Sequence, residues 1–198
     1  KADGEYKIRG LACRREDTPP FVAEAQLQVL QILSKETDPR RLTRLLPEVV
    51  GVVQERLSAL NGKRVFPGEL LVTQTLSREL DEYRLPSPAA RAARQLQSTG
   101  RNVRMGQRIQ FIYTTTRPGV HAWDMPGPFD PALIDATRYG ELLFRAVHEV
   151  LEPLGVSGSV LRNWMFSRAS YLLPPGWLHH RLELPLFANL QRLRVDML

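Results

Sequence analysis

The spacing of apolar residues predicts two helices in the first third of the chain. Between residues 19 and 34, apolar side chains recur every three or four positions. Thr18 is suited to cap this helix, and Pro19 to occupy its first position. Asp38, followed by a proline, repeats this start signal before a second periodic segment, 39–60. We therefore expect two amphipathic helices over these ranges.

Other segments have the composition or the alternation of short strands. Residues 69–76 are β-rich, and residues 108–113 place apolar side chains mainly on one side. Residues 5–15 also have strand character, with Gly10 as a weak point where a bulge could form. The four prolines of residues 117–131 predict a loop.

Two further helices have clear boundaries. Ser87 is suited to cap a helix over residues 88–98, and Gly100 to end it in a left-handed conformation. A strongly periodic segment, 135–155, ends in a glycine, and from Val156 onward the pattern assigns no element. Several helices and a few short strands indicate a mainly helical α+β fold.

The excess of positive charge is confined to one part of the chain. The sequence contains 27 Lys and Arg residues against 21 Asp and Glu, a net charge of +6. Six arginines lie between Tyr83 and Arg108, where there is no acidic residue, and outside that stretch the charges balance. They are Arg84, Arg91, Arg94, Arg101, Arg104 and Arg108.

Two interpretations of these arginines are open. Guanidinium groups bind phosphate oxygens in a bidentate way and stay charged, which favours contact with a nucleic-acid backbone. Backbone amides at the start of the helix near Ser87 would add a second anion-binding element. Alternatively, the arginines form a solvated face that pairs with carboxylates from elsewhere in the chain. The lack of acidic residues between positions 83 and 108 favours the first interpretation.

The sequence gives little sign of a catalytic centre of its own. The four histidines, His121, His148, His179 and His180, do not have metal-ligand spacing, and neither a nucleophile elbow nor a glycine-rich phosphate loop occurs. A single cysteine, Cys13, fits a reducing compartment, so we expect a cytoplasmic protein. The longest apolar runs are too short to span a membrane.

Three stretches in continuous order resemble the end of the palm and the thumb of family B DNA polymerases. They read IRGLACRRED, VTQTLSRELDEYRLPSPAARAARQLQSTGRNVRMGQRIQFIY and FDPALIDATRYGELLFRAVHEVLEPLG. Compared with the family pattern, Ala89 stands where a histidine is common, and Arg84 replaces a lysine. The motifs DTPPF and GVHAWDMP are more similar to the bacterial branch of the family than to the archaeal one.

The resemblance implies three regions. Residues 1–17 would be the end of a palm-like strand segment, residues 18–155 a thumb-like helical bundle with short β segments that binds DNA, and residues 156–198 a carboxyl-terminal tail. The function implied is the binding of duplex primer–template DNA without sequence specificity. The expected DNA-binding residues are Arg78, Tyr83, Arg84, Ser87, Arg91, Arg94, Arg101 and Arg104.

The resemblance also implies what must come from elsewhere. In these polymerases, palm motifs of the DTD and SLYP kind hold the metal ions of phosphoryl transfer, and neither motif occurs in this sequence. We therefore expect the chain alone to be inactive, without a cofactor of its own. A catalytic portion or subunit, with its magnesium, would complete a polymerase of replication or repair.

Two alternatives concern partners. The chain could instead be a non-catalytic interaction subunit that assembles a replication or repair complex. In its tail, ELPLF resembles the short peptide with which bacterial polymerases dock on the sliding clamp, which would make Leu184, Leu186 and Phe187 clamp-binding residues. The competing interpretation is that these three side chains pack the tail onto the rest of the protein.

Overall fold

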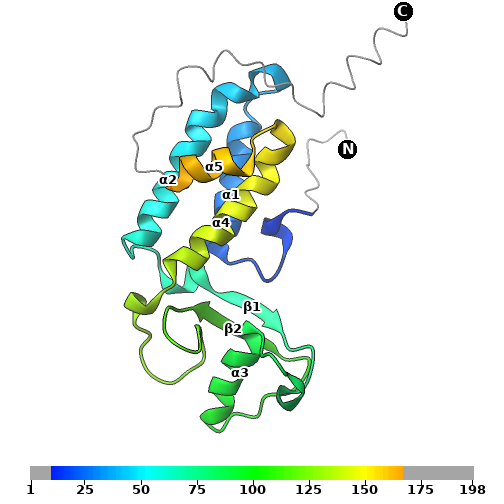
Figure 1. Cartoon of the computed structure of the whole chain (residues 1–198), viewed down its shortest axis with the longest axis vertical. Helices are drawn as coiled ribbons and strands as arrows, with labels where there is room; N and C mark the ends of the chain where they lie inside the picture. Colours follow the sequence, from blue (N-terminus) through cyan, green and yellow to red (C-terminus); the bar gives the residue numbers. More distant parts are fainter. Residues whose placement is uncertain (1–9, 167–198) are drawn as a thin grey trace, which may run out of the picture.

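Four helices form one lobe of the computed structural model, which describes residues 10–166 (Figure 1). Helix α1 spans Pro20–Leu33 and α2 spans Leu46–Asn61. Helix α4, Ala136–Leu151, packs along α1, and α5, Gly158–Phe166, packs against α2 and α4. Each helix directs its apolar stripe inward, because burying that face is the main source of its stability. We call these four helices the helical lobe.

The two predicted start signals have different outcomes. Helix α1 begins at Pro20, and Thr18, expected as its cap, is not the capping residue. Asp38 does cap, since its side chain accepts a backbone N–H bond, but the segment that follows, Pro39–Leu45, is a 3₁₀ helix. The α-helix starts only at the next residue, with Pro47 in its first turn. A continuous α-helix would bring the ring of Pro47 against the carbonyl four residues earlier.

A three-stranded antiparallel sheet and one helix form a smaller lobe, the sheet lobe (Figure 1). Strand β1 (Val72–Thr75) pairs with β2 (Arg108–Tyr113), which pairs with β3 (Val120–Ala122). Strand β3 lies in the segment for which we predicted only a loop. A turn that ends at Gly119, with φ of +81°, reverses the chain after β2 and allows this short pairing.

Helix α3, Pro88–Ser98, covers the sheet and has the predicted boundaries. The Ser87 hydroxyl accepts the Ala90 N–H at 3.2 Å, and Gly100 follows the helix with a φ of +86°. The face against the sheet consists mostly of alanines that are almost completely buried. Because these side chains are small, the helix can lie close to the strands. Its two arginines, Arg91 and Arg94, lie outside the buried face.

The amino-terminal segment differs from the prediction in its described part. We expected strand character over residues 5–15, but residues from position 10 onward contain a 3₁₀ helix, Ala12–Arg14. The N–H groups of its first two residues donate to Glu149 Oε2 at 3.0 Å and to Gln26 Oε1 at 2.7 Å. Side chains of α4 and α1 thus satisfy the donors that a strand partner would have used.

The start of the expected tail belongs to the helical lobe. Gly155, with a φ of +83°, ends the helical region after α4, as predicted. Helix α5 follows at once, and Gln54 of α2 donates a hydrogen bond to the Trp164 carbonyl at 2.8 Å. Leu161 and Met165 of α5 are buried. Residues 167–198 lie outside the described residues, and with them the proposed clamp-binding side chains Leu184, Leu186 and Phe187.

Candidate nucleic-acid interface

A tightly bonded loop connects β1 to α3. The Tyr83 hydroxyl lies 3.2 Å from both the backbone nitrogen and the hydroxyl of Ser77. Between them, a 3₁₀ helix at Leu80–Glu82 is closed by reciprocal bonds between Glu79 and Glu82, each side chain accepting the backbone N–H of the other residue. The loop therefore has a defined shape, although most of its side chains are exposed.

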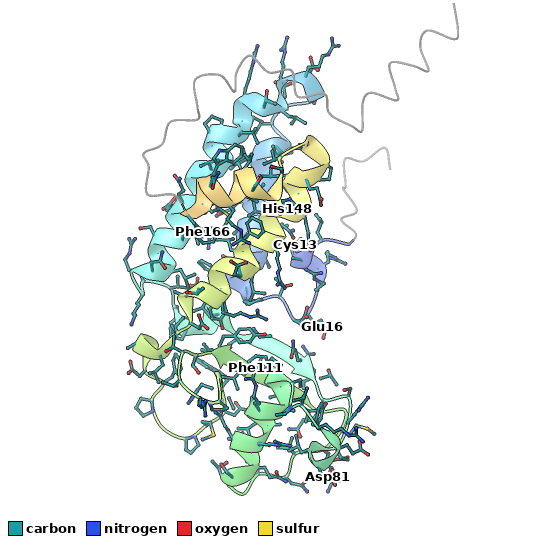
Figure 2. The ribbon with its side chains drawn as sticks, in the orientation of Figure 1. Cys13, Glu16, Asp81, Phe111, His148 and Phe166 are labelled. Atoms are coloured by element: carbon teal, nitrogen blue, oxygen red, sulfur yellow. The ribbon has the colours of Figure 1, made fainter. Side chains whose placement is uncertain are left out.

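An open hollow of about 450 Å³ lies between this loop, strand β1 and the amino-terminal segment. Five of its lining side chains carry hydroxyl groups: Thr73, Thr75, Ser77, Tyr83 and Ser87. Glu16 and Asp17 also contribute to its lining, and Glu16 lies on the segment that passes beside the two lobes (Figure 2). We call this feature the hydroxyl hollow. Hydroxyl groups and helix starts are common ligands of backbone phosphates.

The sequence predicted only part of the hydroxyl hollow. Tyr83 and Ser87 were expected as binding residues and both line it. Thr73 and Thr75 were missed. Residues two apart on a strand point to the same side, so the threonine alternation in β1 was the available signal. What that alternation could not indicate is that α3 would begin beside it.

Two of the predicted DNA-binding arginines bind the protein's own backbone. Arg91 Nη1 donates to the Pro118 carbonyl at 2.7 Å, and Arg94 Nη2 donates to the Leu80 carbonyl at 3.0 Å. The Nε atom of Arg91 is buried and has no partner among the described residues. Both arginines therefore stabilise loops beside α3 through these bonds, and each keeps further N–H groups that can bind another acceptor.

Arg101, which was also predicted to bind DNA, and Arg108, which belongs to the arginine stretch but not to that prediction, form ion pairs at the surface. Arg101 lies 3.3 Å from Asp124, and Arg108 lies 3.5 Å from Glu16. The interpretation that carboxylates from elsewhere neutralise the arginine stretch is thus correct for these two residues. All four side chains are more than half exposed, and pairs of this kind contribute at most about 1 kcal/mol. A polyanion could displace such carboxylates at little cost.

The remaining three of the predicted arginines, Arg78, Arg84 and Arg104, are exposed, and their guanidinium groups have neither an ion pair nor a hydrogen bond with any described residue. We call them the open arginines. Arg78 and Arg84 flank the loop that borders the hydroxyl hollow. Arg104 belongs to a turn that is tied to that loop, since the Met105 N–H donates to Glu79 Oε1 at 3.2 Å. Three exposed cations therefore lie on this loop and on the turn bonded to it, and the loop also carries Glu79, Asp81 and Glu82 between its two arginines.

A second hollow, of about 470 Å³, has different chemistry. Its lining includes Glu79, Asp81 and Arg94, and Arg94 is already bonded to Leu80. Asp81 lies at the end of the sheet lobe that is far from the helical lobe (Figure 2). Each hollow is lined by two carboxylates, but this one lacks the five hydroxyl groups of the hydroxyl hollow, and its guanidinium is already bonded.

The described residues do not contain a cluster suited to metal catalysis. Among residues 10–166, no three His, Cys, Asp or Glu side chains come together as a potential metal site. Burial raises the pKa of the Cys13 thiol and lowers the pKa of His121, which disfavours a reactive thiolate and a charged imidazole. No helix in this part of the chain has the length and apolar character needed to cross a membrane.

The chain is similar in sequence to archaeal DNA polymerases. It is 28% identical over 156 residues to DNA polymerase 1 of Saccharolobus solfataricus, which covers 78% of this chain and 17% of that protein. It is 31% identical over 166 residues to the DNA polymerase of Desulfurococcus sp. (strain Tok), covering 81% of this chain and 21% of the relative. The chain thus spans about a fifth of the length of these relatives.

A solved structure has a similar fold. The family B DNA polymerase from the hyperthermophilic archaeon Pyrobaculum calidifontis superposes with a TM-score of 0.59 at 24% identity, covering 71% of this chain and 18% of that one. The family model described as DNA polymerase family B matches residues 1–138, more than two thirds of the sequence. The chain therefore belongs to DNA polymerase family B.

Proposed function

We propose that this chain is the thumb-containing, carboxyl-terminal part of a family B DNA polymerase, and that it holds duplex primer–template DNA without reading its sequence. Membership of the family supports the choice of ligand. The observation that carries the proposal is that the open arginines Arg78 and Arg84 lie on the loop whose Ser77 and Tyr83 line the hydroxyl hollow, and that Arg104 lies on the turn bonded to that loop.

In this proposal the contacts are to the DNA backbone. The open arginines bind phosphates directly, and Tyr83 and Ser87, with the threonines of β1, donate hydroxyl hydrogen bonds to neighbouring phosphates. Arg101 exchanges its exposed carboxylate partner for a phosphate. Arg91 and Arg94 contribute chiefly by fixing the loops. Contacts of this kind are independent of base sequence, as a polymerase requires of its grip on the product.

The proposal divides the chain as the resemblance implied. The thumb-like region is residues 18–155, extended by α5, and residues 1–17 would lead in from the palm. The bacterial-type branch and a cytoplasmic location remain predictions. So does clamp binding by Leu184, Leu186 and Phe187, which lie outside the described residues.

Catalysis would come from elsewhere in the polymerase. Magnesium ions, when bound by a catalytic portion, would supply the charge that phosphoryl transfer requires. The described residues do not fit this role, because no three His, Cys, Asp or Glu side chains among them come together as a potential metal site. Their contribution would be to hold the duplex behind the reacting end.

A salt titration tests the proposed contacts with the DNA backbone. Fluorescence anisotropy of the full chain with duplexes of unrelated sequence should give equal affinities, and a plot of log affinity against log salt with a slope of about −3 to −4.5, as expected for roughly three to five phosphate contacts. Replacing the open arginines together by Gln should reduce that slope by about 2 to 3. A marked sequence preference, or an unchanged slope, would refute the proposal.

The matched control removes the same charge from the helical lobe. Arg40, Arg41 and Arg44 are exposed on the 3₁₀ segment before α2. Their joint replacement by Gln lowers the net charge equally, so it should leave the slope close to that of the parent chain. An equal effect of both triple variants would mean that only overall charge matters.

A further inference from the structure

Leu85 is the most exposed of the large apolar side chains that the structure describes, at 90%. Single exposed leucines are common, and exposure alone has no functional meaning. Leu85 differs because of its position. It lies in the loop between β1 and α3, next to the open arginine Arg84 and two residues before Ser87, the cap of α3.

The structure holds this side chain in water on a rigid support. On one side, the Tyr83 hydroxyl anchors the loop to Ser77. On the other, Pro86 and Pro88 fix the backbone φ angles, and Ser87 is bonded to α3. A preformed loop loses little conformational entropy when it meets a partner. An apolar group presented in this way is well suited to binding.

The sequence of chemical groups around Leu85 indicates the kind of partner. In the sequence, Arg84 provides a cation immediately before Leu85, and α3, whose dipole attracts anions at its start, begins three residues after it. An apolar group between two anion-binding positions complements the minor groove of DNA, where sugars lie between two lines of phosphate. That groove is about 6 Å wide and admits single apolar side chains, whereas the major groove accommodates a whole helix.

We propose that Leu85 enters the minor groove of the duplex held by this chain and packs against its sugars. The inference rests on the proposed function and adds an apolar contact to a DNA-binding surface that otherwise consists of charged and hydroxyl groups. Such a contact would not select a base sequence strongly, because the minor groove presents a degenerate pattern of donors and acceptors. It would add affinity that is insensitive to salt.

The test compares Leu85→Ala with Leu27→Ala in the full chain. Leu27 lies on α1 in the helical lobe and is 37% exposed, so it is a matched leucine away from the loop. We expect L85A to weaken duplex binding about five- to tenfold without a change in salt slope. L27A should bind as the parent chain does. Circular dichroism should be unchanged for L85A, because the side chain is exposed.

A competition experiment identifies the groove. Saturating an A·T-rich duplex with netropsin, which occupies the minor groove, should weaken binding of the parent chain about five- to tenfold. It should have much less effect on L85A, which has already lost the contact. An equal effect of netropsin on both proteins would overturn the assignment to the minor groove.

Other outcomes separate this inference from the function on which it rests. If the parent chain binds duplex and L85A binds equally well, the inference is wrong and the proposed function stands. If the parent chain does not bind duplex, both fail. If the parent chain sediments as a dimer and L85A as a monomer, Leu85 belongs to a self-association surface, which also overturns the inference.

Discussion

The Tyr139 hydroxyl donates a hydrogen bond of 2.7 Å to the carbonyl oxygen of Leu70, and this bond joins the helical lobe to the sheet lobe. Tyr139 belongs to α4, whereas Leu70 ends the 3₁₀ segment that leads into β1. The same hydroxyl accepts the N–H of Tyr113, at the end of β2, at 3.0 Å. Burial raises the pKa of Tyr139 far above its ordinary value, so the donated proton is retained. One buried side chain thus connects α4 with the segment that leads into β1 and with the end of the central strand β2.

Removing this hydroxyl should be costly. Tyr139→Phe leaves a buried carbonyl and a buried N–H without their partner, so we expect a loss of about 2–3 kcal/mol in the free energy of unfolding, measured with urea. Tyr113→Phe is the control, because the Tyr113 hydroxyl does not form a hydrogen bond with any described residue. It should cost less than about 0.5 kcal/mol. Equal losses would show that the bridge is not what stabilises the junction.

The contact between the amino-terminal segment and the helical lobe should depend on Gln26. This side chain is fully buried, accepts the Cys13 N–H, and donates to the Ala146 carbonyl at 2.6 Å. Gln26→Leu should lower the free energy of unfolding by about 2 kcal/mol, because it leaves the Cys13 N–H unpaired and removes the side-chain bond to the Ala146 carbonyl. Hydrogen exchange at Cys13 should accelerate as well. Gln31→Leu, at an exposed position of the same helix, should change neither quantity.

The two classes of arginine should respond differently to substitution. Arg84→Gln removes an open arginine, so it should reduce the salt slope of duplex binding by about 0.9 and leave unfolding unchanged. Arg94→Gln removes a bond to a backbone carbonyl, so it should cost about 1 kcal/mol of stability and change the slope by less than about 0.3. The reverse pattern in paired titration and urea experiments would mean that Arg94 is the phosphate ligand.

The chain alone should bind primer–template but not extend it. Its described residues contain no cluster of carboxylates that could hold two metal ions. A primer-extension assay with Mg²⁺ or Mn²⁺ should therefore yield no product, while duplex binding persists in the presence of EDTA. Extension by the purified chain would contradict the proposal that this chain binds the duplex while another portion of the polymerase catalyses the reaction.

Local signals predicted the elements that depend on neighbouring residues. Ser87, Pro88 and Gly100 set the ends of α3, because a cap acts within one turn of the helix. The α+β fold class, dominated by helix, followed from the same kind of pattern. Where two signals competed at the start of α1, the prediction was one residue early, since Pro19 and Pro20 are both suited to a first turn.

Of the candidate site, the sequence indicated the residue types and the approximate place. The arginine stretch was visible as a local excess of charge, and Tyr83 and Ser87 were visible as polar residues beside a predicted helix start. Which arginines are open was not visible, because their partners are distant in the sequence. Arg94 bonds to a carbonyl 14 residues away, and Arg101 pairs with Asp124.

The tertiary structure decided everything that requires the chain to return on itself. Strand β3 exists because a turn brings three residues beside β2, and the amino-terminal segment is not a strand where Gln26 and Glu149 bind its N–H groups. The sequence by itself determined helix ends, apolar faces and the local concentration of charge, since these depend on residues within a few positions of one another. Pairings across more than ten residues depend on how the lobes pack, so only the folded chain separates the open arginines from those that brace it.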